Sequence, residues 1–531
     1  MSQPFETIVI GAGISELVAA SYLARAGQRV LVLEEHEEPG GVHVTEETVP
    51  GFRFDTCAGD IGYVNPQIIQ DLELVKHGLD ILSVEPTVFS PVENGDGLLL
   101  GKGTDTVAAI ARLSTVDASK WLTFSERMAR LAQFLWLLYS EAPPWPTSKN
   151  RSDLLALLGI GRRLRGLGKV GMLEFLRTVP MPVADLLDDW FENDALKGAL
   201  GAAGVSHIFQ GPKSAGTAFV MLHHLVGQAA GAVRSRTVLR GGVGMLAAAL
   251  TRALTERGGE LRTGCGVERI LVDTGRVRGV VTREGEETPG TRVVCGADPK
   301  RTFLELVDPV HSEPEFLRQV QHIKLHGSAA KVNLALGESP DFGCPETHLR
   351  GAISIAPSLE HLERAYDDAK HGRIARNPYL DVSIPSLTDP SLAPPGKHVM
   401  SVWMQYAPYR LRDGSAWDAH AREALGEQVI ETLARYAPNL PGAIIDRQVL
   451  TPVDLEARFG LTEGHLYQGD LTLDQILFMR PVPGWSRYAT PIDGLVLCGA
   501  ATHPGGGITG MSGYLAARQV LRPSRKRPAP S

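Results

Sequence analysis

The sequence TIVIGAGISELVAASYLARAGQRVLVLE, residues 7–34, decides the fold of this chain. Its first four residues are apolar and predict a buried strand, residues 17–27 predict a helix, and residues 28–33 predict the next parallel strand. Gly11 permits the tight turn before the helix, and Gly13 lets the backbone approach a pyrophosphate at the helix N-terminus. Glu34 ends the second strand, where an acidic side chain accepts hydrogen bonds from a ribose. The stretch therefore predicts a βαβ dinucleotide-binding unit.

The third glycine position of such a unit is occupied here by Glu16. A glycine at this position allows the helix and the strand to pack closely. A carboxylate about 5 Å from a pyrophosphate costs roughly 3 kcal/mol per charge pair at an effective dielectric constant near 20. The sequence leaves four outcomes open: the Glu16 side chain turns to solvent, it bonds the N-terminal amides of its own helix, it is protonated, or nucleotide binding is weak or lost.

Composition limits the class of protein. The 531 residues are 43% hydrophobic, enough for a large core and more than one domain, and the net charge of −7 argues against a general nucleic-acid binder. The five cysteines include no Cys-x-x-Cys pair, which argues against disulfide-reductase chemistry and a cysteine zinc site. The N-terminus runs straight into the first strand, and no apolar stretch is long enough for a membrane span. We therefore expect a soluble, cytoplasmic protein.

Changes in periodicity along the chain predict an interleaved domain organisation. From residue 104 the pattern becomes helical, and near residue 236 strand signals return, with a hairpin at 267–273 and 276–282. We expect an α/β fold in which a Rossmann-type domain is interleaved with an α+β substrate domain and a helical insertion. The expected segments are 1–103, 236–310 and 491–521 for the nucleotide domain, 104–235 for the helical insertion, 311–490 for the substrate domain, and 522–531 for a disordered tail.

A second glycine-rich motif lies near the C-terminus. Residues 495–501 predict a strand, and the loop THPGGGITG, residues 502–510, leads into a helix. Consecutive glycines leave backbone N–H groups free to face a flat or anionic ligand, and the helix behind them adds the positive end of its dipole. The loop therefore predicts a second ligand-binding element, with a tight packing turn as the alternative.

These motifs and several others resemble those of the phytoene-desaturase-like flavoproteins. The shared motifs are Gly11-Ala12-Gly13 with residues 17–20, the pair Gly40-Gly41, and residues 45–47, 50–54, 405–409 and 469–475. The resemblance extends from residue 5 to about residue 521, and the ending from residues 480–485 through 502–507 is specific to one branch of the family. It implies an FAD-binding two-domain fold like that of amine oxidases.

The resemblance also implies an extended FAD molecule between the opening motif and the C-terminal loop, with the backbone of Val267 holding the adenine end. The FAD-binding residues that it implies are Gly11, Gly13, Ser15, Glu16, Glu34, Gly40, Gly41, Val267, Gly499, Gly505, Gly506, Gly507, Ile508 and Thr509. Family members desaturate, saturate or isomerise carbon–carbon bonds, so the resemblance implies an oxidoreductase for a hydrophobic small molecule. A eukaryotic member is mitochondrial, and a mitochondrial matrix location follows only by analogy.

Three short segments depart from the family pattern near the expected cofactor. They are the residues after Gly13, the acidic turn after Glu34, and the pair after Gly41, namely Ile14, Ser15 and Glu16, then Glu35, Glu37 and Glu38, then Val42 and His43. The first two segments add negative charge where a pyrophosphate is expected, and no compensating arginine is visible nearby in the sequence. The alternative function is therefore a flavoprotein-like scaffold with a degenerate FAD site that acts as a regulatory or interaction protein.

Candidate catalytic residues are few, because a flavin itself supplies hydride-transfer chemistry. His503, at the mouth of the glycine loop, is a candidate for moving a proton or orienting substrate, with a turn residue bonded to backbone as the alternative. His43 either contacts the flavin ring or fills a gap at the surface. The pair His223-His224 and the nearby acidic residues offer no metal-ligand spacing, so we expect no metal site.

Two segments of the helical insertion bear on substrate access. Residues 134–139 and 143–145 are apolar and aromatic, which suits a tunnel for a lipid-like substrate, contact with a membrane surface, or a buried helix. Arg162, Arg163, Arg165 and Lys169 form a basic run that suits anionic lipid heads or a solvated helix face. Peripheral membrane contact is therefore one expectation, and the oligomeric state is not predicted.

Overall fold

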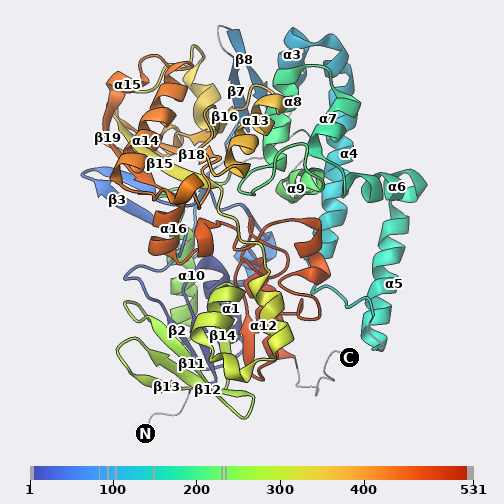
Figure 1. The fold of residues 1–531 in the computed structure, drawn as a ribbon, viewed down its shortest axis with the longest axis vertical. Coiled ribbons are helices and arrows are strands. Elements are labelled where there is room, and N and C mark those ends of the chain that lie inside the picture. The colour runs from blue at the N-terminus through green and yellow to red at the C-terminus, as the bar shows by residue number, and fades with distance from the viewer. Residues whose placement is uncertain are drawn as a thin grey trace.

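The computed structural model describes residues 5–82, 84–85, 87–92, 95–101, 104–147, 150–228, 231, 233 and 236–522. Two large sheets lie one above the other along the long axis of the molecule, and helices surround both (Figure 1). The lower sheet has five strands and contains the N-terminal βαβ unit, and the upper sheet has seven. The predicted disordered tail, beyond residue 522, lies outside the described residues.

The five-stranded sheet has the strand order β10-β2-β1-β14-β20, and its strands run parallel. The strands are β1 (Thr7–Ile10), β2 (Val30–Leu33), β10 (Glu260–Arg262), β14 (Val293–Cys295) and β20 (Leu495–Leu497). They come from three separate stretches of the chain, which confirms the interleaved Rossmann-type fold. The carboxyl ends of parallel strands meet at one edge of a sheet, so the turns after β1, β14 and β20 lie together.

Both faces of this sheet are covered. One face packs on α1 (Ile14–Arg25), α10 (Gly244–Glu256) and α17 (Met511–Leu521), and the other packs on α12 (Pro314–Gln321) and a three-stranded antiparallel sheet. The strands of that small sheet are β11 (Val267–Asp273), β12 (Arg276–Thr282) and β13 (Glu287–Pro289). The hairpin of β11 and β12 has the predicted bounds, whereas α1 begins earlier than predicted. The burial of both faces explains the continuous apolar runs of the strands.

The seven-stranded sheet has the strand order β19-β15-β18-β17-β16-β7-β8 and packs on α14 (Ala419–Ala434). Its strands are β7 (Val88–Val92), β8 (Gly95–Leu100), β15 (Ala329–Leu336), β16 (Ala352–Ile355), β17 (Tyr379–Ser383), β18 (His398–Gln405) and β19 (Ile444–Leu450). The sequence placed residues 84–101 in the nucleotide domain, but β7 and β8 form an edge of this second sheet. Since β7 pairs with β16, far later in the chain, local pattern could not show this.

Shorter elements connect the two sheets. They are β3 (Thr45–Val49), β4 (Phe52–Asp55), β5 (Tyr63–Val64), α2 (Pro66–Asp71), β6 (Ile81–Leu82), β9 (Val238–Leu239), α11 (Pro299–Arg301), α13 (Leu359–Lys370), α15 (Leu440–Ala443), α16 (Pro452–Phe459) and β21 (Ile508–Thr509). The pairing of β21 with β5 holds the C-terminal glycine loop against the N-terminal part of the chain.

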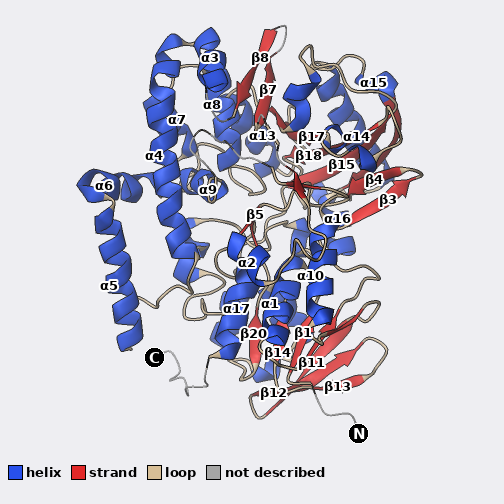
Figure 2. Ribbon diagram, turned by 180° about the vertical axis from the view of Figure 1, so that it is seen from behind, coloured by secondary structure: helices blue, strands red, loops and turns tan. Residues whose placement is uncertain are grey.

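The predicted helical insertion is confirmed. Its helices are α3 (Thr104–Leu113), α4 (Thr115–Tyr139), α5 (Arg151–Gly166), α6 (Gly168–Thr178), α7 (Val183–Trp190), α8 (Asp194–Gly201) and α9 (Thr217–His224). The aromatic segment at the end of α4 is a buried helix, since Phe134, Leu135 and Tyr139 are at most 3% exposed. By contrast, α5 and α6 stand apart from the body of the molecule in both views (Figures 1 and 2). Within the described ranges, every helix is too short or too polar to cross a bilayer.

Candidate functional site

A cavity of about 370 Å³ lies between the two sheets. One end is formed by the turns after β1 and β2, and the other by residues of the helical insertion and of the seven-stranded sheet. The C-terminal loop, residues 505–510, lines the cavity between these ends. The cavity therefore brings together the two glycine-rich motifs that lie at opposite ends of the sequence.

The turn between β1 and α1 is open on the side that faces the cavity. Gly11 has a φ of +92°, which favours glycine, and a Cβ on Gly41 would lie 3.3 Å from the Cα of Gly13. Gly13 caps α1 without a side-chain hydrogen bond to the helix, so the first N–H groups of α1 point at the cavity without a side-chain cap from this residue. This arrangement fits the pyrophosphate of a dinucleotide.

Glu16 lies inside the protein, beneath this turn. The residue is 7% exposed, and a Cβ on either Gly13 or Gly296 would overlap its carboxyl group. Burial raises the pKa of the carboxyl to about 7, although bonds to its own backbone N–H and to the Cys498 thiol, with Sγ at 3.6 Å, act to lower it. The solvent-exposed alternative is wrong, and partial protonation with bonding to the helix N-terminus describes the residue.

Glu34 occupies the position expected of a ribose acceptor. It is 5% exposed and lines the cavity, with Oε2 accepting a hydrogen bond from the Ala12 N–H at 2.6 Å and Oε1 accepting one from the His36 N–H at 2.9 Å. These two backbone bonds fix the plane of the carboxylate. Each oxygen keeps a lone pair for a ligand hydroxyl, since an ionised carboxylate offers about four acceptor sites.

The acidic turn after Glu34 is compensated by arginines that the sequence pattern did not reveal. Glu35 pairs with Arg283 and lies 3.6 Å from Arg301, and Arg301 itself lines the cavity. Glu37 and Glu38 are exposed and lie outside the cavity wall. The expectation that no arginine compensates this turn is therefore wrong, because β12 and α11 bring both arginines from distant parts of the chain.

The C-terminal glycine loop needs glycine for close contacts as well as for conformation. A Cβ on Gly506 would overlap the ring of Tyr467, and Gly507 has a φ of +87°. The Gly507 carbonyl accepts a hydrogen bond from the Tyr63 N–H at 3.0 Å, and the Gly506 carbonyl lies 2.7 Å from Nε2 of His223. The loop carbonyls are thus turned toward the protein, which leaves neighbouring N–H groups for a ligand.

A buried arginine holds this loop to the next segment of the site. Arg480 is 1% exposed, and its guanidinium donates hydrogen bonds to six backbone carbonyls. They belong to Tyr467, Gly469, Asp470, Gln475, Ala500 and Thr502. The sequence alone shows residues 480–485 only as a motif, and this network is the physical role of its first residue.

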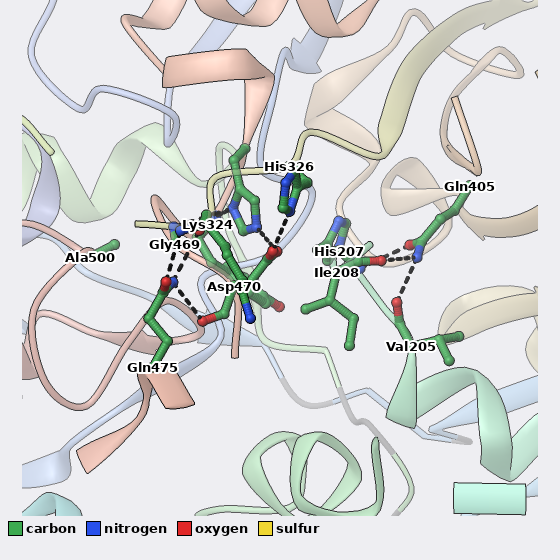
Figure 3. A network of polar contacts seen from close by, with 12 residues as sticks. Val205, His207, Ile208, Lys324, His326, Gln405, Gly469, Asp470, Gln475 and Ala500 are labelled. Atoms are coloured by element: carbon green, nitrogen blue, oxygen red, sulfur yellow. Dashed lines mark hydrogen bonds and ion pairs between the residues drawn. The ribbon is translucent and has the colours of Figure 1, made fainter. Parts of the chain in front are cut away.

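Two further polar networks position the loops around the cavity (Figure 3). The Asp470 carboxylate points at His326, with 2.8 Å to Nδ1, and lies 2.8 Å from Nε2 of His465; these bonds outweigh burial and lower the pKa of Asp470 to about 2. Gln405 accepts a hydrogen bond from the N–H of His207 and donates to the carbonyls of Val205 and Ile208. Gln405 therefore shapes the loop that presents His207 to the cavity.

Most of the expected cofactor-binding residues line the cavity. They are Gly11, Gly13, Ser15, Glu16, Glu34, Gly40, Gly41, Gly505, Gly506, Gly507, Ile508 and Thr509. Val267 and Gly499 lie outside its wall. Gly499 instead packs against Gly296, whose carbonyl a Cβ would overlap, so its glycine serves the close approach of β14 and β20. His43 lines the cavity, and burial lowers its pKa to about 4.

His503 lies outside the cavity wall. It is 0% exposed, its Nε2 is 3.2 Å from the Leu138 carbonyl, and its ring stacks edge-on with Tyr139. Burial lowers the pKa of His503 to about 3, so the imidazole is neutral across the physiological range. This geometry favours the structural alternative, a turn residue that docks the glycine loop on α4.

Replacing His503 with glutamine is expected to lower turnover by less than about fivefold, whereas loss of a proton-transfer group costs roughly 100-fold or more. The variant keeps a side-chain amide that can reach the Leu138 carbonyl. Turnover and flavin content of the purified variant measure the effect. A loss near 100-fold with full flavin content contradicts the structural role.

The far end of the cavity carries a polar wall that the sequence pattern does not identify. Tyr467, Trp403, His207 and His224 line it, and the Nε2 of His224 is 2.9 Å from the Tyr467 hydroxyl. The Nδ1 of His224 lies 2.7 Å from the Ala203 carbonyl, so Nδ1 carries the proton and Nε2 accepts from the tyrosine. No local motif marks these residues, because they come from four separate segments.

A buried lysine stands behind this wall. Lys331, on β15, is 0% exposed, and its Nζ lies 4.9 Å from the centre of the Trp403 ring and 3.3 Å from where a Cβ of the cavity-lining Gly59 would stand. Within the described part of the chain, Nζ has no hydrogen-bond partner. Burial lowers the pKa of Lys331 to about 8. A buried donor without a partner at the edge of a glycine-lined cavity fits a site for a flat, polar ring.

No metal site accompanies the cavity: among the residues that the structure describes, no cluster of three or more histidine, cysteine or acidic side chains has metal-binding geometry.

Comparison with known proteins identifies the family. Residues 9–59 match the NAD(P)-binding Rossmann-like domain, and residues 178–521 match the family described as flavin containing amine oxidoreductase. The chain is 35% identical to pyridine nucleotide-disulfide oxidoreductase domain-containing protein 2 of Rattus norvegicus, over 98% of this chain and 93% of the relative. It is 29% identical to a limonene dehydrogenase chain of Castellaniella defragrans, over 97% and 94%. It is 26% identical to the phytoene desaturase (neurosporene-forming) of Cereibacter sphaeroides, over 98% and 95%.

Solved structures share the fold. An oxidoreductase from Methanosarcina mazei aligns with a TM-score of 0.62 at 17% identity, over 97% of this chain and 99% of that chain. Wild-type putrescine oxidase bound to putrescine aligns with a TM-score of 0.58 at 15% identity, over 97% and 98%. Together with the cavity that joins both glycine motifs, these matches place the chain in the flavin-containing amine oxidoreductase family, among its phytoene-desaturase-like members, and make it a flavin-dependent oxidoreductase.

Proposed function

We propose that this protein is an FAD-dependent oxidoreductase that dehydrogenates, saturates or isomerises a carbon–carbon bond of a hydrophobic small molecule. The observation that carries the proposal is the cavity in which the turn of Gly11 and Gly13, the C-terminal glycine loop and the Trp403 wall meet. Its nucleotide end lies against the five-stranded sheet and its far end against the seven-stranded sheet, as a two-domain oxidoreductase requires.

FAD, rather than FMN, suits the nucleotide end. The N-terminus of α1 suits a pyrophosphate and Glu34 suits the hydroxyls of a ribose, and FMN has neither a pyrophosphate nor a second ribose. Residues 505–507 would then lie along the flavin half. When bound, the flavin supplies the hydride-transfer chemistry. The protein's own residues bind and orient the substrate and keep water out.

The far end of the cavity suits an uncharged, hydrophobic substrate. Its lining includes the apolar or aromatic side chains Val42, Tyr63, Val226, Leu461 and Leu466. The cation nearest the wall, Lys331, lies in a fully buried position. A cationic amine within roughly 5 Å of it would cost about 3 kcal/mol at an effective dielectric constant near 20. This charge disfavours a protonated amine and supports an alkene or alkane carbon–carbon bond.

Two relatives support the same substrate class. The phytoene desaturase and the limonene dehydrogenase chain are named for hydrophobic hydrocarbons, and both align over at least 97% of this chain. The amine oxidases align at 15–16% identity and share the fold only.

The test is reduction of the bound flavin under anaerobic conditions. We expect cyclic and linear terpenes to bleach the flavin absorption, or terpenes to be isomerised, and we expect putrescine and cyclohexylamine to leave it unchanged. Rapid bleaching by an amine, with no reaction of any hydrocarbon, contradicts the proposed substrate class.

One observation favours the alternative, a scaffold with a degenerate cofactor site: the carboxyl of Glu16 lies at the pyrophosphate turn. A protein that binds no flavin at a pH where Glu16 is protonated would support this alternative.

A further inference from the structure

The arm formed by α5 and α6, residues 151–178, exposes large apolar side chains. Six of them are at least 47% exposed: Leu154, Leu155, Leu158, Val170, Leu173 and Leu176. None of the leucines of α5 is buried in the described structure. Six such side chains on one projecting arm form a patch of the kind that marks an interaction surface, since isolated exposed leucines are ordinary but clusters are not.

The arm is tied to the body only near its two ends. The Asp153 carboxylate, 4% exposed, pairs with Arg487, and Arg487 also donates to the Pro143 carbonyl at 3.1 Å. On α6, Phe175 packs edge-on against Phe134 with ring centres 4.8 Å apart. Between these anchors the helices contribute little to the core (Figures 1 and 2). The exposed leucines are therefore not explained by packing within this chain.

The composition of α5 makes it a weak helix in water. Its 16 residues include Gly159, Gly161 and Gly166, and a glycine in a helix interior costs about 1 kcal/mol relative to alanine. In proteins most of the stability of a helix comes from packing of its apolar face. Because α5 buries no leucine in the described structure, a surface that accepts its apolar residues would supply the missing stability.

The arm is basic, in contrast to the rest of the chain. It carries six basic and two acidic side chains, a net charge of +4, in a protein with a net charge of −7. Arg162, Arg163, Arg165 and Lys169 are exposed, and none of the four pairs with a carboxylate among the described residues. Leu158 and Arg162 are one turn apart, and Arg165 follows on the same face. Apolar and basic groups thus share one surface.

We propose that the arm docks this protein on an anionic lipid bilayer. The leucines of α5 and α6 enter the boundary between headgroups and acyl chains, and the arginines reach the lipid phosphates. Each basic residue near an anionic membrane surface contributes about a fivefold gain in affinity. Among the described residues no helix spans a bilayer, so the contact is peripheral.

A second copy of the chain is a poorer partner for this surface. A symmetric contact between two arms would bring two clusters of unpaired cations together, which opposes association. The apolar residues of α5 are also spread over leucines one, three and four positions apart, with no groove that a rigid partner helix would fill. A deformable, negatively charged lipid surface satisfies both the charge and the shape of the arm.

The experiment is flotation of the full-length, flavin-loaded protein with two kinds of vesicle. One is phosphatidylcholine alone, and the other is an equimolar mixture of phosphatidylcholine and phosphatidylglycerol. At low salt we expect at least about tenfold stronger partition onto the anionic vesicles, and a decline with rising salt. The variants Leu155→Glu/Leu158→Glu and Arg162→Glu/Arg165→Glu are each expected to lose this binding about tenfold or more.

Matched controls separate docking from folding. Val310→Glu changes a residue that is 78% exposed and outside the arm, and it should float like the wild type. Flavin content and melting temperature show that each variant is folded. Equal partition of the wild type onto both vesicles, or anionic binding that survives both double substitutions, overturns the proposal. So does a protein that floats with neither vesicle and forms a dimer which Leu155→Glu/Leu158→Glu converts to a monomer.

Discussion

Replacing Lys331 with methionine is expected to raise the free energy of unfolding by about 3 kcal/mol at pH 7 and to lower turnover at least tenfold. Burial lowers the pKa of Lys331 from 10.5 to about 8, and one pKa unit corresponds to about 1.4 kcal/mol. Methionine fills the same volume without a charge. Because the protein retains a destabilising cation beside the cavity wall, the cation is expected to serve activity.

The pH dependence gives this prediction a sign. The folded-state pKa is depressed, so the unfolded chain binds the proton more readily, and the stability of the wild type should rise between about pH 8 and pH 10.5. Lys331→Met lacks this rise, and its advantage should shrink above pH 8. Denaturant unfolding at several pH values measures both curves. Lys397→Met, at an exposed lysine, is the control and should change stability by less than about 0.5 kcal/mol. Equal stability of Lys331→Met and wild type at pH 7 contradicts the account.

Replacing Glu16 with glutamine is expected to raise the free energy of unfolding by about 3 kcal/mol at pH 8 and to leave it nearly unchanged at pH 4.5. Burial raises the pKa of the Glu16 carboxyl from 4.5 to about 7. The folded protein therefore holds a proton that the unfolded chain releases, and wild-type stability falls as pH rises from about 4.5 to 7. Glutamine keeps the shape of the side chain and does not ionise.

The same substitution should tighten FAD binding at least tenfold at pH 8, because it removes a negative charge at the turn that faces the pyrophosphate. Titration with FAD at pH 5.5 and pH 8 measures the effect: wild-type affinity should fall as pH rises, and the affinity of Glu16→Gln should not. Glu38→Gln, at an exposed position of the neighbouring acidic turn, is the control. If Glu16→Gln and wild type have the same affinity at both pH values, Glu16 has no part in cofactor binding.

Local patterns in the sequence predicted the elements on which the site is built. The β1–α1–β2 unit, the hairpin of β11 and β12, and the strand, loop and helix at the C-terminus all follow from apolar periodicity and glycine positions. These elements depend on interactions between residues close in sequence, or on glycine conformations that only a few turns require. The helical insertion was predicted for the same reason.

The residues that long-range topology brings together could not be predicted in this way. Arg301 compensates the acidic turn because α11 follows β14, the neighbour of β1 in the sheet. Lys331 reaches the cavity edge because β15 pairs with β18, which carries Trp403. A lone lysine in an apolar strand carries no local signal beyond the charge itself. That charge, in a strand buried on both faces, was the one clue in the sequence.

Glu16 was recognised as unusual, but its direction could not be read from the motif. The side chain points inward because Gly13, Gly296 and the Cys498 thiol leave space beneath the turn, and two of these residues follow strands far along the chain. Its altered pKa follows from that burial.

The visible absorption spectrum of the freshly purified protein, with the flavin released by denaturation and identified, tests the central claim most directly. The account predicts the twin absorption bands of an oxidised flavin and close to one FAD per chain, with binding strongest at pH values where Glu16 is protonated. A colourless protein that takes up no added FAD at pH 5.5 would contradict it.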